Sequence, residues 1–116
     1  MVLLLAKGVG MGGGGTSFTA QGKVFLYTSA NWTSGAAFHY EAYYRATAGT
    51  AETRLYDVDA GAAVTSGGLS TTSTSFARER TAALTLVDGN QYTAQFGGAA
   101  GGAGEAKGWT IIVVQS

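Results

Sequence analysis

Residues 38–46 alternate strictly between two kinds of side chain, and this period of two constrains the fold more than any other feature. One parity holds only Phe, Tyr and Ala, while the other parity is His39, Glu41, Tyr43 and Arg45. Such a pattern is typical of a strand with one face in the core and one face in solvent. At ~3.3 Å per residue this strand would extend about 30 Å, which is long for a small domain.

Residues 51–58 repeat the alternation after a turn at 48–50. Because only a few turn residues separate the two runs, we predict that they pair as an antiparallel hairpin. Residues 76–87 are strand-like but change phase, since Arg78 and Arg80 share the parity of Leu84 and Leu86. A bulge near 81–83, or a bend from one sheet to another, would resolve this conflict.

The remaining runs complete an all-β pattern. Residues 24–28 and 91–96 are rich in aromatic and β-branched side chains, and residues 109–114 are apolar at both parities. The last run is therefore predicted to be covered on both faces. No window has helical spacing, and glycine-rich turns separate the strands. This arrangement predicts an antiparallel β-sandwich or barrel.

Composition excludes several classes of protein. The 116 residues suffice for one domain. The net charge is zero, so no basic face is expected for nucleic acid. Cysteine is absent, which removes disulfides, thiolate nucleophiles and cysteine-based metal sites.

The N-terminus combines a short apolar run with a glycine-rich stretch. Residues 2–6 are too few for a membrane span and lack the features of a signal peptide, so no membrane partner is expected. Residues 8–15 are mostly glycine. We interpret residues 1–21 as a flexible arm and residues 22–116 as the folded domain. The assembly contacts of this arm would be Val2, Leu3, Leu4 and Leu5. Alternatively, the same residues form the first strand of the domain's own sheet.

Several segments resemble one known group of domains. They are residues 49–57 (GTAETRLYD), 69–76 (LSTTSTSF), 83–86 (ALTL) with Gly89, 92–96 (YTAQF) and 111–116 (IIVVQS). This pattern of core residues and turns is similar to small jelly-roll domains of bacteriophage structural proteins and some bacterial surface proteins. The resemblance covers roughly residues 24–116. It implies a jelly-roll-like β-sandwich that serves display, assembly or recognition, and it implies no active-site residues.

No motif indicates catalysis, a cofactor or a metal. Residues 8–13 fit G-x-G-x-x-G, but no helix follows, as dinucleotide binding would require. His39 is the one histidine, and its neighbour Glu41 is equally typical of a solvated strand face. Residues 57–61 resemble the opening of a calcium loop but lack its later acidic ligands. We therefore expect a protein that is not an enzyme and has no cofactor.

Two classes of function remain. The favoured one is a structural virion protein, a phage capsid-decoration or tail-associated subunit. It would form a homo-oligomer, with a trimer favoured, and contact capsid or other particle proteins on the virion surface. A binding module is usually part of a larger chain. This sequence starts at Met1 and ends on a predicted strand, which favours the virion protein. The alternative is a carbohydrate-binding or adhesin module. Its candidate ligand or partner contacts are Trp32, Tyr43 and Tyr56. For Trp32, the favoured alternative is that it folds back and caps one end of the sandwich.

Overall fold

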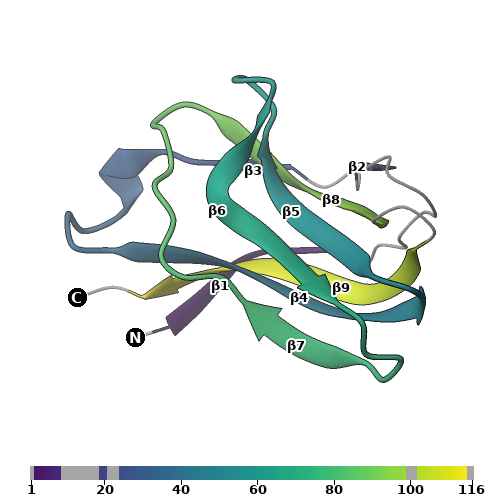
Figure 1. Cartoon of the computed structure of the whole chain (residues 1–116). Helices are drawn as coiled ribbons and strands as arrows, with labels where there is room; N and C mark the ends of the chain where they lie inside the picture. The colour runs from purple at the N-terminus through teal and green to yellow at the C-terminus, as the bar shows by residue number, and fades with distance from the viewer. Residues whose placement is uncertain (1, 9–18, 21–23, 99–101, 115–116) are drawn as a thin grey trace.

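The strands of the protein form two packed layers (Figure 1). The computed structural model describes residues 2–8, 19–20, 24–98 and 102–114. The first sheet has the order β1-β9-β4-β7, namely β1 (Val2–Gly8), β9 (Ala103–Val114), β4 (Ala37–Ala48) and β7 (Ala77–Arg80). The second sheet has the order β2-β8-β5-β6, namely β2 (Thr19–Ala20), β8 (Gln91–Gly98), β5 (Ala51–Asp57) and β6 (Ala62–Thr71). Strand β3 (Phe25–Leu26) also pairs with β8, and a short 3-10 helix, η1, spans Ser29–Asn31.

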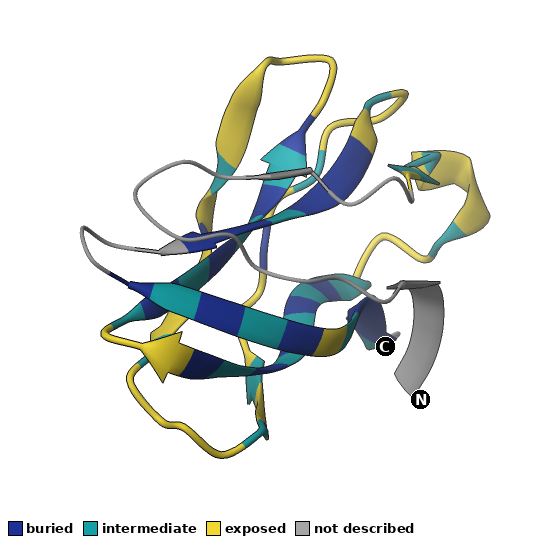
Figure 2. Ribbon diagram, turned by 90° about the vertical axis from the view of Figure 1, so that its right-hand side faces the viewer, coloured by how far each residue is buried: buried dark blue, intermediate teal, exposed yellow. Residues whose placement is uncertain are grey.

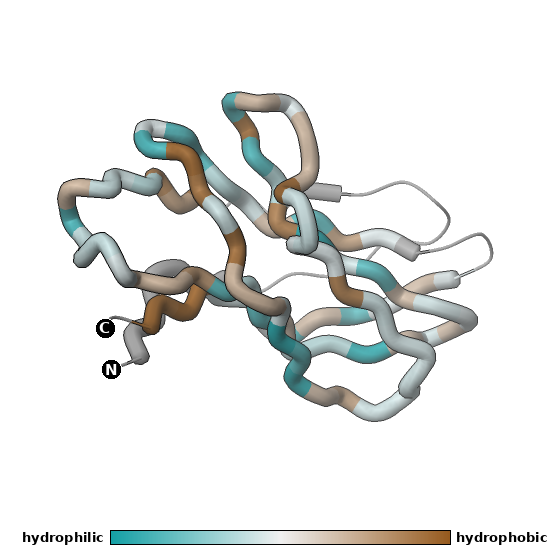
Figure 3. The backbone as a smooth tube through the Cα atoms, turned by 60° about the vertical axis from the view of Figure 1, so that its left-hand side comes forward, coloured by the Kyte–Doolittle hydropathy of each residue, from teal (hydrophilic) through white to brown (hydrophobic). Residues whose placement is uncertain are grey.

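Every strand pairing in the described residues is antiparallel, so the predicted all-β sandwich is confirmed. Buried and half-buried residues alternate along β4 and β5, as the bands in Figure 2 show. The inward faces of both sheets supply the core, whose largest buried side chains are Trp109, Tyr40, Tyr44, Tyr92, Phe96 and Leu55. Residues 109–113 are buried at both parities, as predicted, and form part of the hydrophobic tract that leads to the C-terminus in Figure 3.

The predicted hairpin between residues 38–46 and 51–58 is wrong. Strand β4 pairs with β9 and β7, whereas β5 pairs with β6 and β8 in the other sheet. The turn between them, with Gly49 at φ 56°, carries the chain from one layer to the other. The apolar faces of β4 and β5 therefore bury each other across the core instead of lying side by side in one sheet.

A buried chain of hydrogen bonds links the two layers. The Tyr40 hydroxyl donates to Thr53 Oγ1 at 2.5 Å, and Thr53 Oγ1 donates to the Gln95 carbonyl oxygen at 2.8 Å. Burial raises the pKa of Tyr40, so its hydroxyl stays protonated and keeps its role as donor. The link satisfies polar groups that would otherwise destabilise the core.

The change of phase in residues 76–87 occurs where one extra residue stands opposite β4, which agrees with the bulge and not with the bend to the other sheet. The backbone N–H groups of Thr81 and Leu84 donate to carbonyl oxygens of β4, at 2.9 and 2.7 Å. The two alanines between them are exposed. The extra residue reverses the parity of the strand, so Arg78 and Arg80 are exposed while Leu84 is buried.

Strand β1 pairs with β9 of the same chain, from Val2 opposite Val114 to Gly8 opposite Trp109. This is the intrachain alternative to the proposed assembly arm of Val2, Leu3, Leu4 and Leu5. Strand β2 joins the second sheet, so both described parts of residues 1–21 belong to the sandwich. The glycine-rich residues 9–18 lie outside the described part of the chain.

We expect Gly104→Ala to destabilise the protein by ~1–3 kcal/mol, because the two sheets approach closely at Gly104. An added Cβ would lie 2.5 Å from the Ala51 Cβ and 2.8 Å from the Arg45 carbonyl oxygen. Gly68→Ala is the matched control, since its Cβ would have its nearest contact at 3.8 Å. Urea unfolding of both variants tests this difference, and equal stabilities would contradict the close approach.

Candidate ligand-binding site

The outer face of the first sheet gathers charged and aromatic side chains. Strand β4 directs its polar parity outward, and the strand register places Arg80 opposite Glu41 and Arg78 opposite Tyr43. On the other side of β4, Glu105 lies opposite Arg45. We call this surface the outer tract, and it comprises Glu41, Tyr43, Arg45, Phe76, Arg78, Arg80, Glu105 and Lys107.

Two aromatic rings form the centre of the outer tract. The rings of Tyr43 and Phe76 lie 5.5 Å apart at an interplanar angle of 44°. Three cations lie over these rings: Arg45 and Lys107 at 4.9 and 4.7 Å from the Phe76 centroid, and Arg78 at 5.5 Å from the Tyr43 centroid. These distances allow cation–π attraction, which holds the long basic side chains over the sheet.

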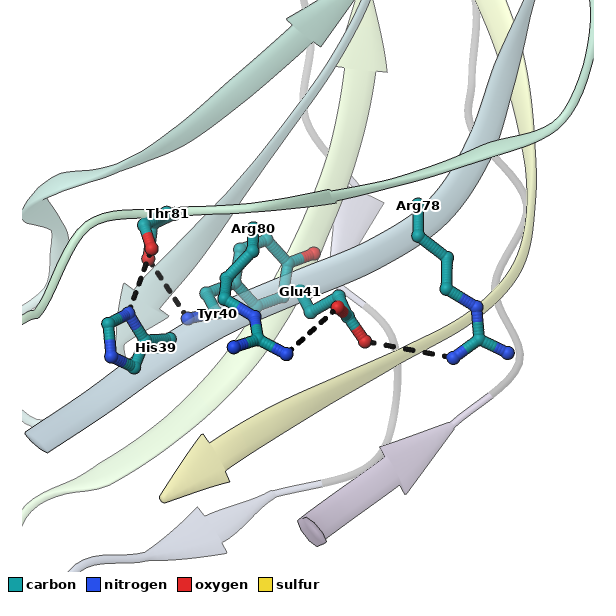
Figure 4. A network of polar contacts seen from close by, with 6 residues as sticks. All are labelled: His39, Tyr40, Glu41, Arg78, Arg80 and Thr81. Carbon is teal, nitrogen blue, oxygen red and sulfur yellow. Dashed lines mark hydrogen bonds and ion pairs between the residues drawn. The ribbon is translucent and has the colours of Figure 1, made fainter. Parts of the chain in front are cut away.

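Two carboxylates lie among these cations. Glu41 contacts Arg80 at 3.5 Å and Arg78 at 3.8 Å, so one carboxylate is shared between two arginines (Figure 4). Arg45 pairs with Glu105 at 2.7 Å. The Arg78 side chain remains 71% exposed, and both of the Glu41 contacts are long for charge-assisted hydrogen bonds. Arg78 is therefore only weakly engaged by its carboxylate.

A groove of about 290 Å³ is hollowed into the outer tract. Its lining residues are Glu41, Tyr43, Arg78, Lys107, Gly108, Trp109 and Thr110. Gly108 lies opposite Tyr43 and leaves space there because it has no side chain. The pairing of β4 with β9 shifts between Tyr43 and Tyr44, which leaves Lys107 without a partner in the register. This bulge places Lys107 over Phe76 and at the groove.

Thr110 also lines this groove, and its hydroxyl is buried. The residue is 7% exposed, and its Oγ1 has no hydrogen-bond partner among the described residues. Buried hydroxyl groups nearly always have a partner, and one without a partner calls for an explanation.

The structure separates the three aromatic residues expected to contact a ligand. Tyr43 lines the groove, but Tyr56 lies on the outer parity of β5 in the other sheet, with Arg54 at 5.7 Å from its ring centroid. Trp32 packs edge-on against core residue Phe38, with ring centroids 6.1 Å apart. These residues therefore do not form one site.

Sequence reasoning missed Phe76, Arg78, Lys107 and Thr110 as site residues. One signal was present: the arginines of residues 76–87 occupy the parity of the leucines, which marks a strand with an outward charged segment. The position of Lys107 had no such signal, because a bulge is created by pairing between strands. His39, which did attract attention, uses its Nδ1–H to donate to the Thr81 carbonyl oxygen at 2.9 Å (Figure 4).

The carboxylates of the calcium-like segment 57–61 hold loops together. Asp57 accepts hydrogen bonds from the Ala60 backbone N–H at 3.0 Å and from Asn90 Nδ2 at 2.9 Å. Asp59 accepts from the Gln91 backbone N–H at 2.5 Å. No group of three metal-ligating side chains occurs within the residues that the structure describes. These acidic turns therefore have a structural role.

We expect Asp57 to make stability depend on pH in the acid range. Burial acts to raise the pKa of Asp57, but the hydrogen bonds from Asn90 and Ala60 outweigh it and hold the pKa below its ordinary value. Its stabilisation is therefore present above the ordinary Asp pKa and is lost as the pH falls through the lower pKa of the folded state.

Urea unfolding from pH 7 to pH 2 should show Asp57→Asn less stable than wild type, with a difference in the free energy of unfolding that narrows in acid. Asp88→Asn, which removes the charge from an exposed carboxylate that accepts a hydrogen bond from the Ser29 N–H, is the control with a smaller effect. A gap that stays constant with pH would contradict the assignment.

Comparisons with known proteins show a similarity in fold only. No family model and no curated protein matches the chain. A CBM36-1 domain of a multidomain xylanase, from the hindgut metagenome of Trinervitermes trinervoides, is similar in structure, with a TM-score of 0.52 and 13% identity over 100% of this chain and 97% of that one. The chain therefore shares a β-sandwich fold with this domain.

Two further solved structures match less closely. One is a Bacillus endospore appendage from a family of disulfide-linked pili, with a TM-score of 0.47 and 14% identity over 99% of this chain and 89% of that one. The other is a CBM36 module in complex with calcium and xylotriose, with a TM-score of 0.46 and 16% identity over 100% and 99%. None of these three structures is described as a phage protein, so the expected virion role gains no support from them. In the described residues, no helix is long and apolar enough to cross a membrane.

Proposed function

We propose that this protein is a non-catalytic carbohydrate-binding module that binds a sugar chain in the groove of the outer tract. The observation that carries the proposal is the set of groups in that groove: an aromatic ring, a carboxylate, a guanidinium and an ammonium group. Sugars present hydroxyl groups to planar polar side chains and C–H faces to aromatic rings, so this set is complementary to them. The volume of about 290 Å³ is at the lower end of small-molecule sites, which suits a short stretch of a longer chain.

The same groove lacks the groups that hydrolysis of a glycoside requires. Such enzymes use two carboxyl groups flanking the scissile bond, roughly 5–9.5 Å apart. Glu41 is the one carboxylate among the residues that line the groove, and it contacts Arg78 and Arg80. The Glu41 carboxylate oxygens can accept hydrogen bonds from sugar hydroxyl groups. Binding without hydrolysis is the role that this chemistry supports.

Tyr43→Ala is expected to weaken binding to an immobilised polysaccharide by about tenfold, because the ring both lines the groove and holds Arg78 over it. Tyr56→Ala is the matched control. Tyr56 also points outward and also has an arginine over its ring, but on the opposite sheet. Affinity electrophoresis against a panel of plant and bacterial polysaccharides, followed by titration calorimetry, measures both. Equal losses for the two variants, or no bound polysaccharide in the panel, would contradict the proposal. Native mass of the intact protein would then test the particle-subunit alternative.

A further inference from the structure

We infer that the groove selects acidic saccharides, chains that carry carboxylate or sulfate groups, and that Lys107 is the residue that recognises the charge. This inference rests on the proposed function, because it names the class of sugar bound at the same site. It starts from the distribution of charge. The chain has seven basic and seven acidic residues, yet the outer tract holds four of the basic ones, Arg45, Arg78, Arg80 and Lys107, against the two acidic residues Glu41 and Glu105.

Pairing within the tract leaves part of this positive charge available. Glu105 compensates Arg45 at 2.7 Å, while Glu41 is shared between two arginines at 3.5 and 3.8 Å. Lys107 is exposed and has no carboxylate partner among the described residues. The two cations that line the groove, Arg78 and Lys107, are therefore the least compensated ones of the tract. An anionic group on the ligand would complete their pairing.

The aromatic pair prepares these cations for an anion. Phe76 holds the Lys107 ammonium at 4.7 Å from its centroid, and Tyr43 holds the Arg78 guanidinium at 5.5 Å. A long basic side chain normally loses considerable conformational entropy when it binds a ligand. Because the rings already restrict Lys107 and Arg78, less of that entropy is lost on binding. The Lys107 ammonium group has three N–H donors, and its attraction to the ring face is electrostatic. N–H donors therefore remain for a carboxylate or sulfate group of the ligand.

The cations over the two rings disfavour binding of a neutral sugar. A neutral sugar gains most from an open aromatic face, but cations lie over the rings of both Phe76 and Tyr43. An acidic sugar can use the cations and the ring edges together. Together these contacts favour the charged form of a saccharide over its neutral form.

The test compares polysaccharides that share a backbone and differ in charge. Polygalacturonate and its fully methyl-esterified form are the carboxylate pair, and carrageenan and chemically desulfated carrageenan are the sulfate pair. We expect the acidic member of at least one pair to bind about tenfold more tightly than the neutral member, with an affinity that falls as salt is raised from 20 to 300 mM. The pair that shows the preference identifies whether carboxylate or sulfate is recognised.

Variants of Lys107 assign the preference to this residue. Lys107→Gln should reduce binding of the acidic polysaccharide about fivefold to tenfold, and Lys107→Arg should retain it because the charge remains. Arg54→Gln, on the outer face of the second sheet, is the control and should bind like wild type. Circular dichroism melting of each variant verifies that the fold is intact, so that a loss of binding reports on the site.

Three outcomes would overturn the inference. If acidic and neutral members bind equally while Tyr43→Ala abolishes both, carbohydrate binding stands and charge selection is wrong. If neither member of either pair binds, carbohydrate binding fails together with the inference. If single-stranded DNA binds as tightly as the acidic polysaccharide, the tract attracts any polyanion and does not select a saccharide.

Discussion

Removal of residues 1–8 is expected to destabilise the sandwich by several kcal/mol, a large part of the ~5–15 kcal/mol typical of a domain, and to cause aggregation. Strand β1 pairs with β9 at six positions, and β4 is the other neighbour of β9. Without β1, the backbone groups of β9 on that side lose their partners. The apolar residues 111–113 would then belong to an exposed edge strand, which is a template for pairing with other chains.

Urea unfolding and light scattering measure the two effects of this truncation. A synthetic peptide of residues 1–8 serves as the control, because it can add back the missing strand by β-augmentation and should restore solubility. The opposite result would be a truncated chain that melts like the intact one while the intact protein loses its oligomeric state on truncation. That result would show that Val2–Gly8 belongs to a neighbouring subunit, and the intrachain pairing would be wrong.

Trp109→Ala is expected to cost ~3–5 kcal/mol, which leaves the protein at the margin of stability. Trp109 is 2% exposed, and its ring lies 6.4 Å from that of Tyr40 in the centre of the core. Its removal leaves a large cavity between strands that are fixed by their pairing, so the surrounding residues cannot collapse into the space. Urea unfolding, with the midpoint and slope compared to wild type, measures the loss.

Trp32→Ala is the matched control for Trp109→Ala. Trp32 is only partly buried and packs against the core from a surface loop, so its removal should cost about 1–2 kcal/mol. Polysaccharide binding should persist in this variant, because Trp32 does not line the groove. Loss of binding with unchanged stability would instead make Trp32 a ligand contact and would contradict the assignment of the site.

The sequence also indicated part of the candidate site, but not its composition. The alternation in residues 38–46 placed Tyr43 on the outward face with Glu41 and Arg45, and the structure has them there. Phe76 and Lys107 reach Tyr43 only because β7 and β9 flank β4 in the same sheet. Trp32 and Tyr56 lie away from the groove. The sequence could not show this, because a pattern of exposed residues does not reveal which sheets and loops are neighbours.

The sequence by itself determined which residues of β4, β5 and β8 face inward, where the phase changes near residues 81–83, and that residues 109–113 are covered on both faces. These properties follow from side-chain alternation, which depends on the backbone of one strand alone. The tertiary structure decided that β4 and β5 lie in different sheets, that β1 covers the edge of β9, and that a bulge aims Lys107 at the groove. Each of these depends on which strands become neighbours. Alternation along a single strand is the same whichever strand lies beside it, so it cannot select the neighbour. The neighbours are selected by the mutual burial of apolar faces from distant parts of the chain.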